Sequence, residues 1–388
     1  MKVSEDIFCV STEDNRNHLF EGQFSVPDGM LYNSYLIIDE KCAVLDTADE
    51  FFCSEWLGQV KNQLGEKRPD FLVVHHAECD HSGSIGLFLK EYPEAKIVAS
   101  AKCISILEQF LGFSLSEKSI AVKEGDVLNL GKRELSFIAA PMIHWPEVMF
   151  SFEKESGILF SADAFGKFGR NKTEDSEWTE EARRYYFGIV GKFGMPVQNV
   201  LKKVSSLGVK IICPLHGPIL SGNIPDYISL YAKWSSYKAE KEGVLVAYAS
   251  IYGHTKIAAE MLASMLKEKG TECFLADLCG ERSIAVAKAF EYSKLVIASV
   301  TYNGGIFPAA EDFIRDLVGR GFCGRKIGLV QNGSWGPLAA KAMKEKLSAC
   351  KDVSFAEQVV TIKGSLNEQS KKELELLASE ILGYAWQS

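Results

Sequence analysis

The 388-residue sequence lacks any two cysteines spaced Cys-x-x-Cys, although it contains ten cysteines. This absence excludes the usual Cys-ligated zinc and iron sites and predicts reduced, mostly buried thiols instead of a disulfide framework. The sequence also lacks an apolar run approaching the ~18 residues of a membrane span, and its acidic N-terminus has no apolar segment behind it. We therefore expect a cytoplasmic protein without membrane segments.

Positive charge is not in excess, because 43 Lys and Arg residues stand against 51 Asp and Glu residues, for a formal net charge of −8. Proteins that bind nucleic acid or an anionic membrane surface need a basic surface, so we expect neither partner. A small, neutral or gaseous substrate is easier to accommodate. Low-complexity tracts are absent, and the length fits two or three domains of roughly 150 residues each.

The two halves of the sequence differ in pattern and meet at the polar stretch 235–243. In the first half, β-rich runs at 34–38, 71–75, 135–139, 158–161 and 210–213 are mixed with helical stretches at 85–91 and 104–111, which is typical of a layered α/β or α+β domain. In the second half, expected strands at 244–249, 273–275, 295–299, 326–331 and 359–361 alternate with expected helices at 255–269, 285–291, 309–317, 338–347 and 369–382. That alternation predicts a doubly wound parallel sheet. We place the domains at 1–242 and 243–388.

The residue types that bind metals are densest directly after the apolar run 71–74, in the stretch His75-His76-Ala77-Glu78-Cys79-Asp80-His81. In extended backbone, His76, Glu78 and Asp80 would share one side, and a turn at Ser82-Gly83 could return His81 to it. Further candidates follow other expected strands: His144, Asp163 and His216. Because loops past strand ends can converge, these residues predict one polydentate site. For the lone His18 and for His75 we expect structural roles.

The pattern His76-x-Glu78-x-Asp80-His81, followed by His144, Asp163 and His216, resembles the ligand set of the flavodiiron proteins. The resemblance covers essentially the whole chain and implies that 1–242 is a metallo-β-lactamase-like αββα sandwich. It assigns His76, Glu78 and His144 to one iron, Asp80, His81 and His216 to the other, and Asp163 to a bridge. Family members differ in whether the residue at the position of His81 binds metal. The stretch Trp145-Pro146-Glu147 also resembles the family and is expected to pack beside the site.

Glu78 stands where zinc hydrolases of the same fold usually have a second histidine. A carboxylate is a harder ligand than imidazole, and mixed N/O sites rich in carboxylate suit iron that changes oxidation state and binds a diatomic ligand. Glu78 therefore favours iron over zinc.

A phosphate-binding loop is predicted where the expected strand 244–249 runs into Ser250-Ile251-Tyr252-Gly253-His254-Thr255 and then a helix. Hydroxyl groups and backbone N–H groups at a helix N-terminus complement phosphate, and Gly253 permits close approach. Two more loops follow the third and fourth strands, Thr301-Tyr302-Asn303-Gly304-Gly305 and Asn332-Gly333-Ser334-Trp335-Gly336. Ligands of doubly wound sheets bind outside such strand ends, where Tyr302 and Trp335 could pack against a planar ring.

The three loops resemble the FMN-binding loops of flavodoxins and of the flavodiiron C-terminal domain, which implies a flavodoxin-like fold for 243–388. A G-x-G-x-x-G dinucleotide fingerprint is absent after the strand 244–249, so the sequence predicts no direct NADH site.

The resemblance implies an oxidoreductase that reduces O2 to water, NO to N2O, or both, at a di-iron centre, with electrons relayed through FMN from an external donor. It also implies a head-to-tail homodimer, or a dimer of such dimers, in which the flavin of one subunit faces the irons of the other. The sequence ends after a helix and has no Cys-x-x-Cys pair for a fused rubredoxin, so we expect a separate rubredoxin or similar donor. The residues do not distinguish O2 from NO.

Two other classes of function stay open at this point. The first is a di-zinc metallo-β-lactamase-type hydrolase with an appended flavodoxin domain, which Glu78 and an idle flavin disfavour. The second is a flavin electron carrier or redox sensor with a vestigial metal site, which is disfavoured because every ligand position is filled. Metal analysis distinguishes the hydrolase, which would hold two zincs, from a di-iron oxidoreductase. Substitution of Asp163 by Ala distinguishes the electron carrier, whose turnover it would leave unchanged, from an enzyme that reduces a gas at the metal site.

Overall fold

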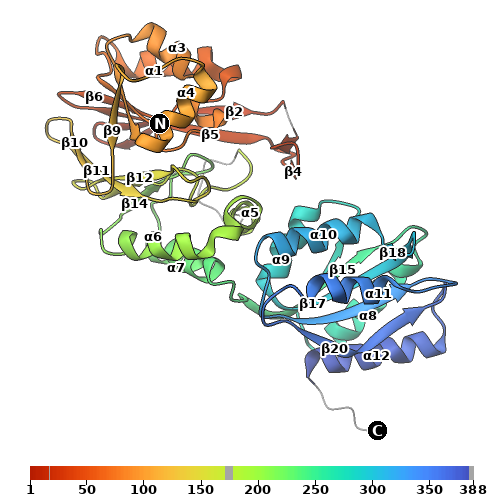
Figure 1. The fold of residues 1–388 in the computed structure, drawn as a ribbon. Helices are drawn as coiled ribbons and strands as arrows, with labels where there is room; N and C mark the ends of the chain where they lie inside the picture. The colour runs from red at the N-terminus through yellow and green to blue at the C-terminus, as the bar shows by residue number, and fades with distance from the viewer. Residues whose placement is uncertain (17, 171–177, 384–388) are drawn as a thin grey trace. The chain divides into compact units, whose positions relative to one another are not determined.

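The computed structural model describes residues 1–16, 18–170 and 178–383. The chain divides into two compact units, Met1–Ala232 and Lys233–Ser388 (Figure 1). The boundary predicted between 242 and 243 falls inside the strand β15 (Lys241–Ala249). Within the described ranges, no helix is long and apolar enough to cross a membrane.

The first unit contains two sheets, with strand orders β1-β2-β5-β6-β7-β8-β9 and β10-β11-β12-β13-β14, and a short hairpin of β3 and β4. The strands are β1 (Lys2–Ser4), β2 (Ile7–Asp14), β3 (Leu19–Phe20), β4 (Phe24–Ser25), β5 (Met30–Ile38), β6 (Cys42–Leu45), β7 (Phe71–Val73), β8 (Lys96–Ser100), β9 (Ser119–Val122), β10 (Val127–Asn129), β11 (Glu134–Ala139), β12 (Met149–Glu153), β13 (Ile158–Phe160) and β14 (Ile211–Cys213).

Helices cover the outer sides of these sheets (Figure 1). The helices of this unit are α1 (Cys53–Leu64), α2 (Cys79–Ser82), α3 (Ile85–Glu91), α4 (Ala101–Leu111), α5 (Trp178–Tyr185), α6 (Gly194–Val204) and α7 (Ile224–Ser235), with short non-α turns η1 (Glu50–Phe52), η2 (Tyr186–Val190) and η3 (Gly191–Phe193). Trp56 of α1, Phe88 of α3 and Leu107 of α4 pack with buried residues of the first sheet in one core. Each such buried side chain contributes about 1.5–3 kcal/mol to folding. The layers confirm the expected αββα sandwich.

The second unit is built around a parallel sheet of order β16-β15-β17-β19-β20, formed by β15, β16 (Cys273–Asp277), β17 (Tyr292–Tyr302), β19 (Lys326–Asn332) and β20 (Ser354–Ile362). The short β18 (Gly305–Ile306) pairs with the end of β17. Numbered along the chain, this order is 2-1-3-4-5, the flavodoxin-like arrangement. The doubly wound sheet predicted from the alternating pattern is confirmed.

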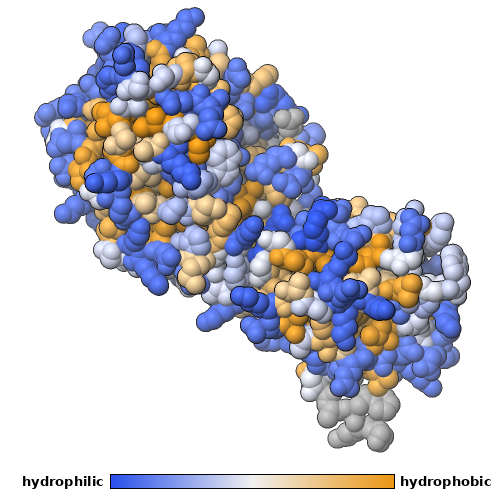
Figure 2. Space-filling view, in the orientation of Figure 1, coloured by the Kyte–Doolittle hydropathy of each residue, from blue (hydrophilic) through white to orange (hydrophobic). Residues whose placement is uncertain are grey.

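Five helices connect these strands: α8 (His254–Glu268), α9 (Arg282–Glu291), α10 (Pro308–Gly319), α11 (Ala339–Leu347) and α12 (Glu368–Leu382). Leu262 and Leu266 of α8 and Leu377 of α12 join strand residues in one core, so these two helices share a face of the sheet. On the molecular face in Figure 2, polar and apolar side chains are interspersed over both units.

Candidate metal centre and flavin site

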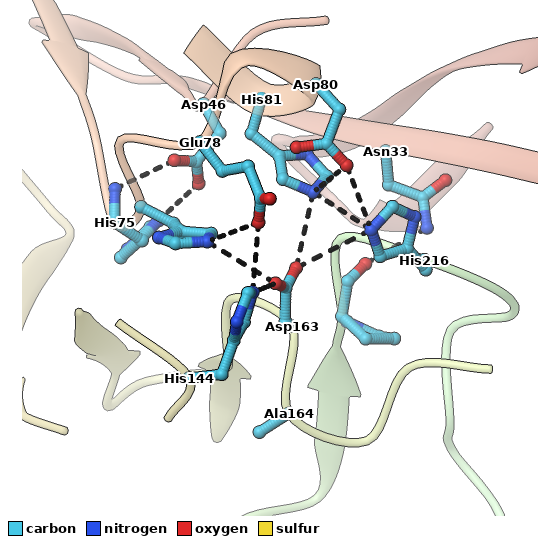
Figure 3. A network of polar contacts seen from close by, with 12 residues as sticks. Asn33, Asp46, His75, Glu78, Asp80, His81, His144, Asp163, Ala164 and His216 are labelled. Carbon is cyan, nitrogen blue, oxygen red and sulfur yellow. Dashed lines mark hydrogen bonds and ion pairs between the residues drawn. The ribbon is translucent and has the colours of Figure 1, made fainter. Parts of the chain in front are cut away.

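The seven residues predicted to bind metal come from four separate segments of the chain and lie together in space; six of them are labelled in Figure 3. His76 and Glu78 follow β7, Asp80 and His81 lie on α2, and His144 lies between β11 and β12; Asp163 follows β13 and His216 follows β14. The fold thus brings together residues that lie up to 140 positions apart in the sequence, from His76 to His216.

The extended backbone predicted for 76–80 is wrong beyond Glu78, because the helix α2 begins at Cys79. Glu78 itself is extended, with φ −61° and ψ 145°. A helical turn, not strand alternation, therefore presents Asp80 and His81. Thr47 fixes this turn, since its backbone N–H and its hydroxyl both donate to the carbonyl of His81 at 2.8 Å.

Four of the residues form a first group, in which imidazole nitrogens face carboxylate oxygens. Oε2 of Glu78 lies 3.1 Å from Nε2 of His76 and 3.0 Å from Nε2 of His144. Oδ2 of Asp163 lies 3.5 Å and 3.1 Å from the same two nitrogens.

A second group forms on the other side of Asp163. Nε2 of His81 lies 3.0 Å from Nε2 of His216, and Oδ2 of Asp80 lies 3.2 Å and 3.4 Å from these nitrogens. Oδ1 of Asp163 lies 3.2 Å from His81 and 3.6 Å from His216. Asp163 therefore gives one oxygen to each group.

These distances fit metal coordination. Two ligand atoms about 2.1 Å from one ion and about 90–110° apart are separated by about 3.0–3.4 Å. Nδ1 of His76 donates to Glu147 at 2.8 Å, so in the neutral ring the lone pair of Nε2 faces the carboxylates of Glu78 and Asp163. The lone pair of Nε2 and the carboxylate oxygens repel one another, and a cation between them or a proton on Nε2 relieves this repulsion. Oδ1 of Asp80 is likewise buried without a hydrogen-bond partner among the described residues.

Without a metal ion, protons would take the place of the missing positive charge. Burial lowers the pKa of His144, but hydrogen bonds with Asp163 and Glu78 outweigh burial and raise it to about 9. Burial raises the pKa of Glu78, but hydrogen bonds from His144 and His76 outweigh it and lower the pKa to about 2. The site holds several carboxylates in their ionised form, as a metal centre requires.

The loops that carry these residues are anchored by buried side chains that the sequence analysis did not identify. Asn33 of β5 donates to the carbonyls of Pro214 and Gly217 at 3.0 and 2.9 Å and so holds the loop of His216. Asp46 accepts from the backbone N–H of His75 at 2.7 Å. Such contacts join residues far apart in sequence, and no local pattern in the sequence indicates them.

His75 has the structural role expected for it. Its Nδ1 lies 2.5 Å from Oδ2 of Asp46 and its Nε2 lies 2.7 Å from Oγ of Ser151, so both ring nitrogens are engaged away from the metal-binding groups. The contact with Ser151 joins the first sheet's loop to β12 of the second sheet.

Backbone conformation near the centre is unusual. Ala162 and Phe165, which flank Asp163, have φ values of 48° and 66°, in the left-handed region that non-glycine residues rarely adopt. Each such residue costs of order 1–3 kcal/mol, a cost typical of functional sites.

A small cavity of about 250 Å³ borders Glu78 of the first group and Asp80 of the second. Its lining includes Arg16, Glu21, Tyr32, Glu78 and Asp80. Burial raises the pKa of Glu21, and the charge of Glu78 adds to this effect. The cavity is smaller than the usual 300–1,000 Å³ of sites for drug-sized ligands.

In the second unit, the three predicted loops line one cavity of about 850 Å³ at the ends of β15, β17 and β19. Of the residues predicted to bind the cofactor, the following line it: Ser250, Tyr252, His254, Thr255, Thr301, Tyr302, Asn303, Gly304, Asn332, Gly333, Ser334, Trp335 and Gly336. Gly253 is the N-cap residue of α8, with a φ of 88° and no side-chain cap, and its N–H donates to Ser250 at 3.1 Å. The N–H groups at this helix end can hold a phosphate.

Two aromatic side chains, Tyr302 and Trp335, line this cavity. Trp335 is 95% exposed and Tyr302 is 44% exposed, so both rings offer surface to a planar ligand. The sequence analysis did not identify Gly364, which also lines the cavity after β20. Asn332 holds it, since its Nδ2 donates to the carbonyl of Gly364 at 2.9 Å and its Oδ1 accepts from the N–H at 3.0 Å. Gly364 has a left-handed φ of 86°, which glycine adopts readily, so the glycine after the expected strand 359–361 was the sequence signal of a tight turn.

Comparisons with known proteins agree with this geometry. Residues 30–217 match the model of the "ODP family beta lactamase". The chain is 30% identical over 371 residues to a nitric oxide reductase of Moorella thermoacetica, an alignment that covers 93% of this chain and 92% of that protein. Rubredoxin oxygen:oxidoreductase of Desulfovibrio gigas has the same fold, with a TM-score of 0.91 at 23% identity over 98% of this chain and 97% of that one. The flavodiiron protein of Giardia intestinalis superposes with a TM-score of 0.90 at 24% identity, covering 98% and 95% of the two chains. The two-unit architecture, the two groups of possible metal ligands and the whole-length relative together place this chain in the flavodiiron protein family, a family of oxidoreductases.

Proposed function

We propose that this chain reduces O2, NO or both, with electrons that an external protein donor supplies through FMN. The observation that carries the proposal is the position of Asp163, whose two oxygens face two separate groups of imidazoles and carboxylates. A carboxylate placed in this way suits two neighbouring ions of one centre.

The proposed ligands follow the two groups. His76, Glu78 and His144 would hold one iron, Asp80, His81 and His216 the other, and Asp163 both. When bound, the flavin supplies electrons one or two at a time and the irons supply a place where a diatomic molecule binds and is reduced. The mixed donor set, with a carboxylate from Glu78 beside two imidazoles, favours iron over the zinc of a hydrolase.

The surrounding residues support a small substrate. His76, His81, His216 and Asp163 are almost fully buried, so the centre is screened from bulk water. The cavity of about 250 Å³ beside Asp80 admits a diatomic molecule more readily than a large organic substrate. Tyr32 lies against both His81 and His216, with ring centroids 6.1 and 5.4 Å away, and closes this side of the centre.

The cavity of the second unit supports FMN as the flavin. One phosphate fits the end of α8, and the exposed rings of Tyr302 and Trp335 in the same cavity can pack against a planar ring system. The loop between β15 and α8 has no dinucleotide fingerprint. These features together favour a mononucleotide.

Three further features belong to the same proposal. The donor is a rubredoxin or a similar protein, the assembly is a head-to-tail homodimer or a dimer of such dimers, and the location is cytoplasmic. The name of the similar Desulfovibrio gigas protein, rubredoxin oxygen:oxidoreductase, supports a rubredoxin as the donor. The ten free cysteines support a reducing compartment.

The test is anaerobic preparation of the iron- and FMN-loaded protein, followed by O2 and NO consumption with reduced rubredoxin as donor. We expect consumption of at least one gas, as O2 uptake without peroxide release or as NO loss with N2O formation. Omission of rubredoxin with NADH present should stop turnover. Hydrolysis of thioesters or lactams by a zinc-loaded chain that consumes neither gas would contradict the proposal.

A further inference from the structure

The two groups of metal-binding side chains have the same donor types. Each contains two imidazoles, one carboxylate of its own and one oxygen of Asp163. With equal donor types, the residues behind the ligands, which orient the rings and tune their basicity, are a source of difference in how the two groups hold their ions.

A buried carboxylate stands behind the first group. Oε1 of Glu147 accepts a hydrogen bond from Nδ1 of His76 at 2.8 Å and another from the N–H of Ala77 at 3.1 Å. The side chains of Glu147 and His76 are both 0% exposed. The other oxygen of Glu147, Oε2, is buried and has no hydrogen-bond partner within 1–16, 18–170 and 178–383. The negative charge of Glu147 therefore acts mainly on His76.

Behind the second group, the histidines have weaker partners. Nδ1 of His216 donates to the neutral backbone carbonyl of Leu31 at 2.9 Å. Nδ1 of His81 is buried, and no described residue forms a hydrogen bond with it. A carbonyl polarises an N–H less than a carboxylate does, and a ring nitrogen without a partner receives no such polarisation.

We propose that Glu147 is a positioning residue that makes the two metal positions unequal, so that the iron held by His76, Glu78 and His144 is released more slowly than the iron held by Asp80, His81 and His216. This inference rests on the ligands of the proposed function. Glu147 accepts the hydrogen bond of Nδ1–H of His76, which makes Nε2 of the same ring a more basic metal ligand. The hydrogen bond from the N–H of Ala77 fixes the carboxylate in place.

The release of iron from the loaded protein tests this directly. Anaerobic, fully loaded protein is mixed with excess chelator, and free iron is measured against time. We expect two phases of one iron each, with rates about 10-fold or more apart, because partners behind a ligand typically change metal affinity by about 10–100-fold. Release of both irons in a single phase would overturn the proposal.

Variants of Glu147 identify which iron is slow. Glu147→Gln keeps an oxygen that can accept from His76 and Ala77 but removes the charge, and we expect the slow phase to quicken about 10-fold while the fast phase is unchanged. Glu147→Ala removes the bond as well and should quicken the slow phase by up to about 100-fold. An equal change in both phases, or no change, would count against the role of Glu147.

Glu153→Gln is the matched control, because Glu153 is also a buried carboxylate but lies at the far end of β12, paired with Arg133 at 3.3 Å. It should lower the thermal stability without altering iron release. If it quickens the slow phase as much as Glu147→Gln does, general loosening explains the result and the inference fails. A chain that holds fewer than two irons contradicts the proposed di-iron function and this inference together, whereas equal release from a gas-reducing, two-iron chain contradicts the inference alone.

Discussion

One oxygen of Asp163 lies 3.2 Å from Nε2 of His81, while the other oxygen of the same carboxylate turns to the opposite group of ligands. The backbone near Asp163 adopts the left-handed region at Ala162 and Phe165, which shapes the loop that carries this side chain. The two groups are therefore parts of one centre, joined through a single residue.

Removal of this shared carboxylate should disable the centre without affecting the flavin site. In Asp163→Ala, we expect gas consumption to fall by more than about 100-fold, since even the loss of a partner behind a ligand costs about 10–100-fold. Bound FMN should remain reducible by reduced rubredoxin, which absorbance during anaerobic titration measures. Unchanged gas turnover would instead support an electron carrier with a vestigial metal site.

Metal binding by the metal-free chain should release protons. The pKa of His144 is raised to about 9, above the ordinary value for histidine, so the metal-free chain holds a proton on this ring at neutral pH. A metal needs the neutral ring, so affinity should rise with pH until about pH 9, by up to about tenfold per unit for each displaced proton. Calorimetry with Co²⁺ in buffers of different ionisation enthalpy counts the protons. His144→Gln should release fewer, and an affinity independent of pH between 6 and 8 would refute this prediction.

The contact between His75 and Asp46 should contribute to the stability of the first unit. His75→Ala leaves a buried carboxylate without its ring partner and should cost about 3 kcal/mol in the free energy of unfolding. Ser151→Ala removes only one hydroxyl and should cost about 1 kcal/mol. Urea unfolding of the metal-free protein measures both changes. Equal stability of His75→Ala and the native chain would show that this contact does not hold the loop.

Flavin binding should depend on the exposed ring of Trp335. In Trp335→Ala we expect FMN affinity to fall by up to about 10-fold, the value of one aromatic contact of about 0.5–1.5 kcal/mol. Stability and iron content should be unchanged, because the side chain is 95% exposed. Fluorescence titration with FMN measures the affinity, and Val318→Ala, an exposed position in the same unit on α10, serves as the control. An affinity equal to that of the control would place the flavin ring elsewhere.

The second unit was predictable in most of its elements because its signals are local. Strands such as 295–299 and 326–331 are apolar on both faces, and the helices between them repeat apolar residues on one side. The predicted strand 359–361 is longer in the structure, where β20 begins at Ser354, because the edge of a sheet tolerates the polar residues Glu357 and Gln358.

The residues that gather in the two groups of possible metal ligands were predictable from the sequence, but their local geometry was not. The spacing from His76 to His81 is compatible with a strand or with the short helix α2, and the choice is made by Thr47, which is distant in sequence and bonds to His81. The bonds of His76 to Glu147 and of Asn33 to Pro214 join segments 71 and 181 positions apart. Such contacts follow from the completed fold, so no pattern within one segment predicts them.

The most direct test of the account is a Mössbauer spectrum of the protein loaded anaerobically with ⁵⁷Fe, with the iron per chain measured on the same sample. The account predicts two irons per chain, magnetically coupled as a pair through the centre that Asp163 shares, and loss of the coupled signal in Asp163→Ala. A single uncoupled iron in the native chain, or a chain that retains zinc and takes up no iron, would contradict it.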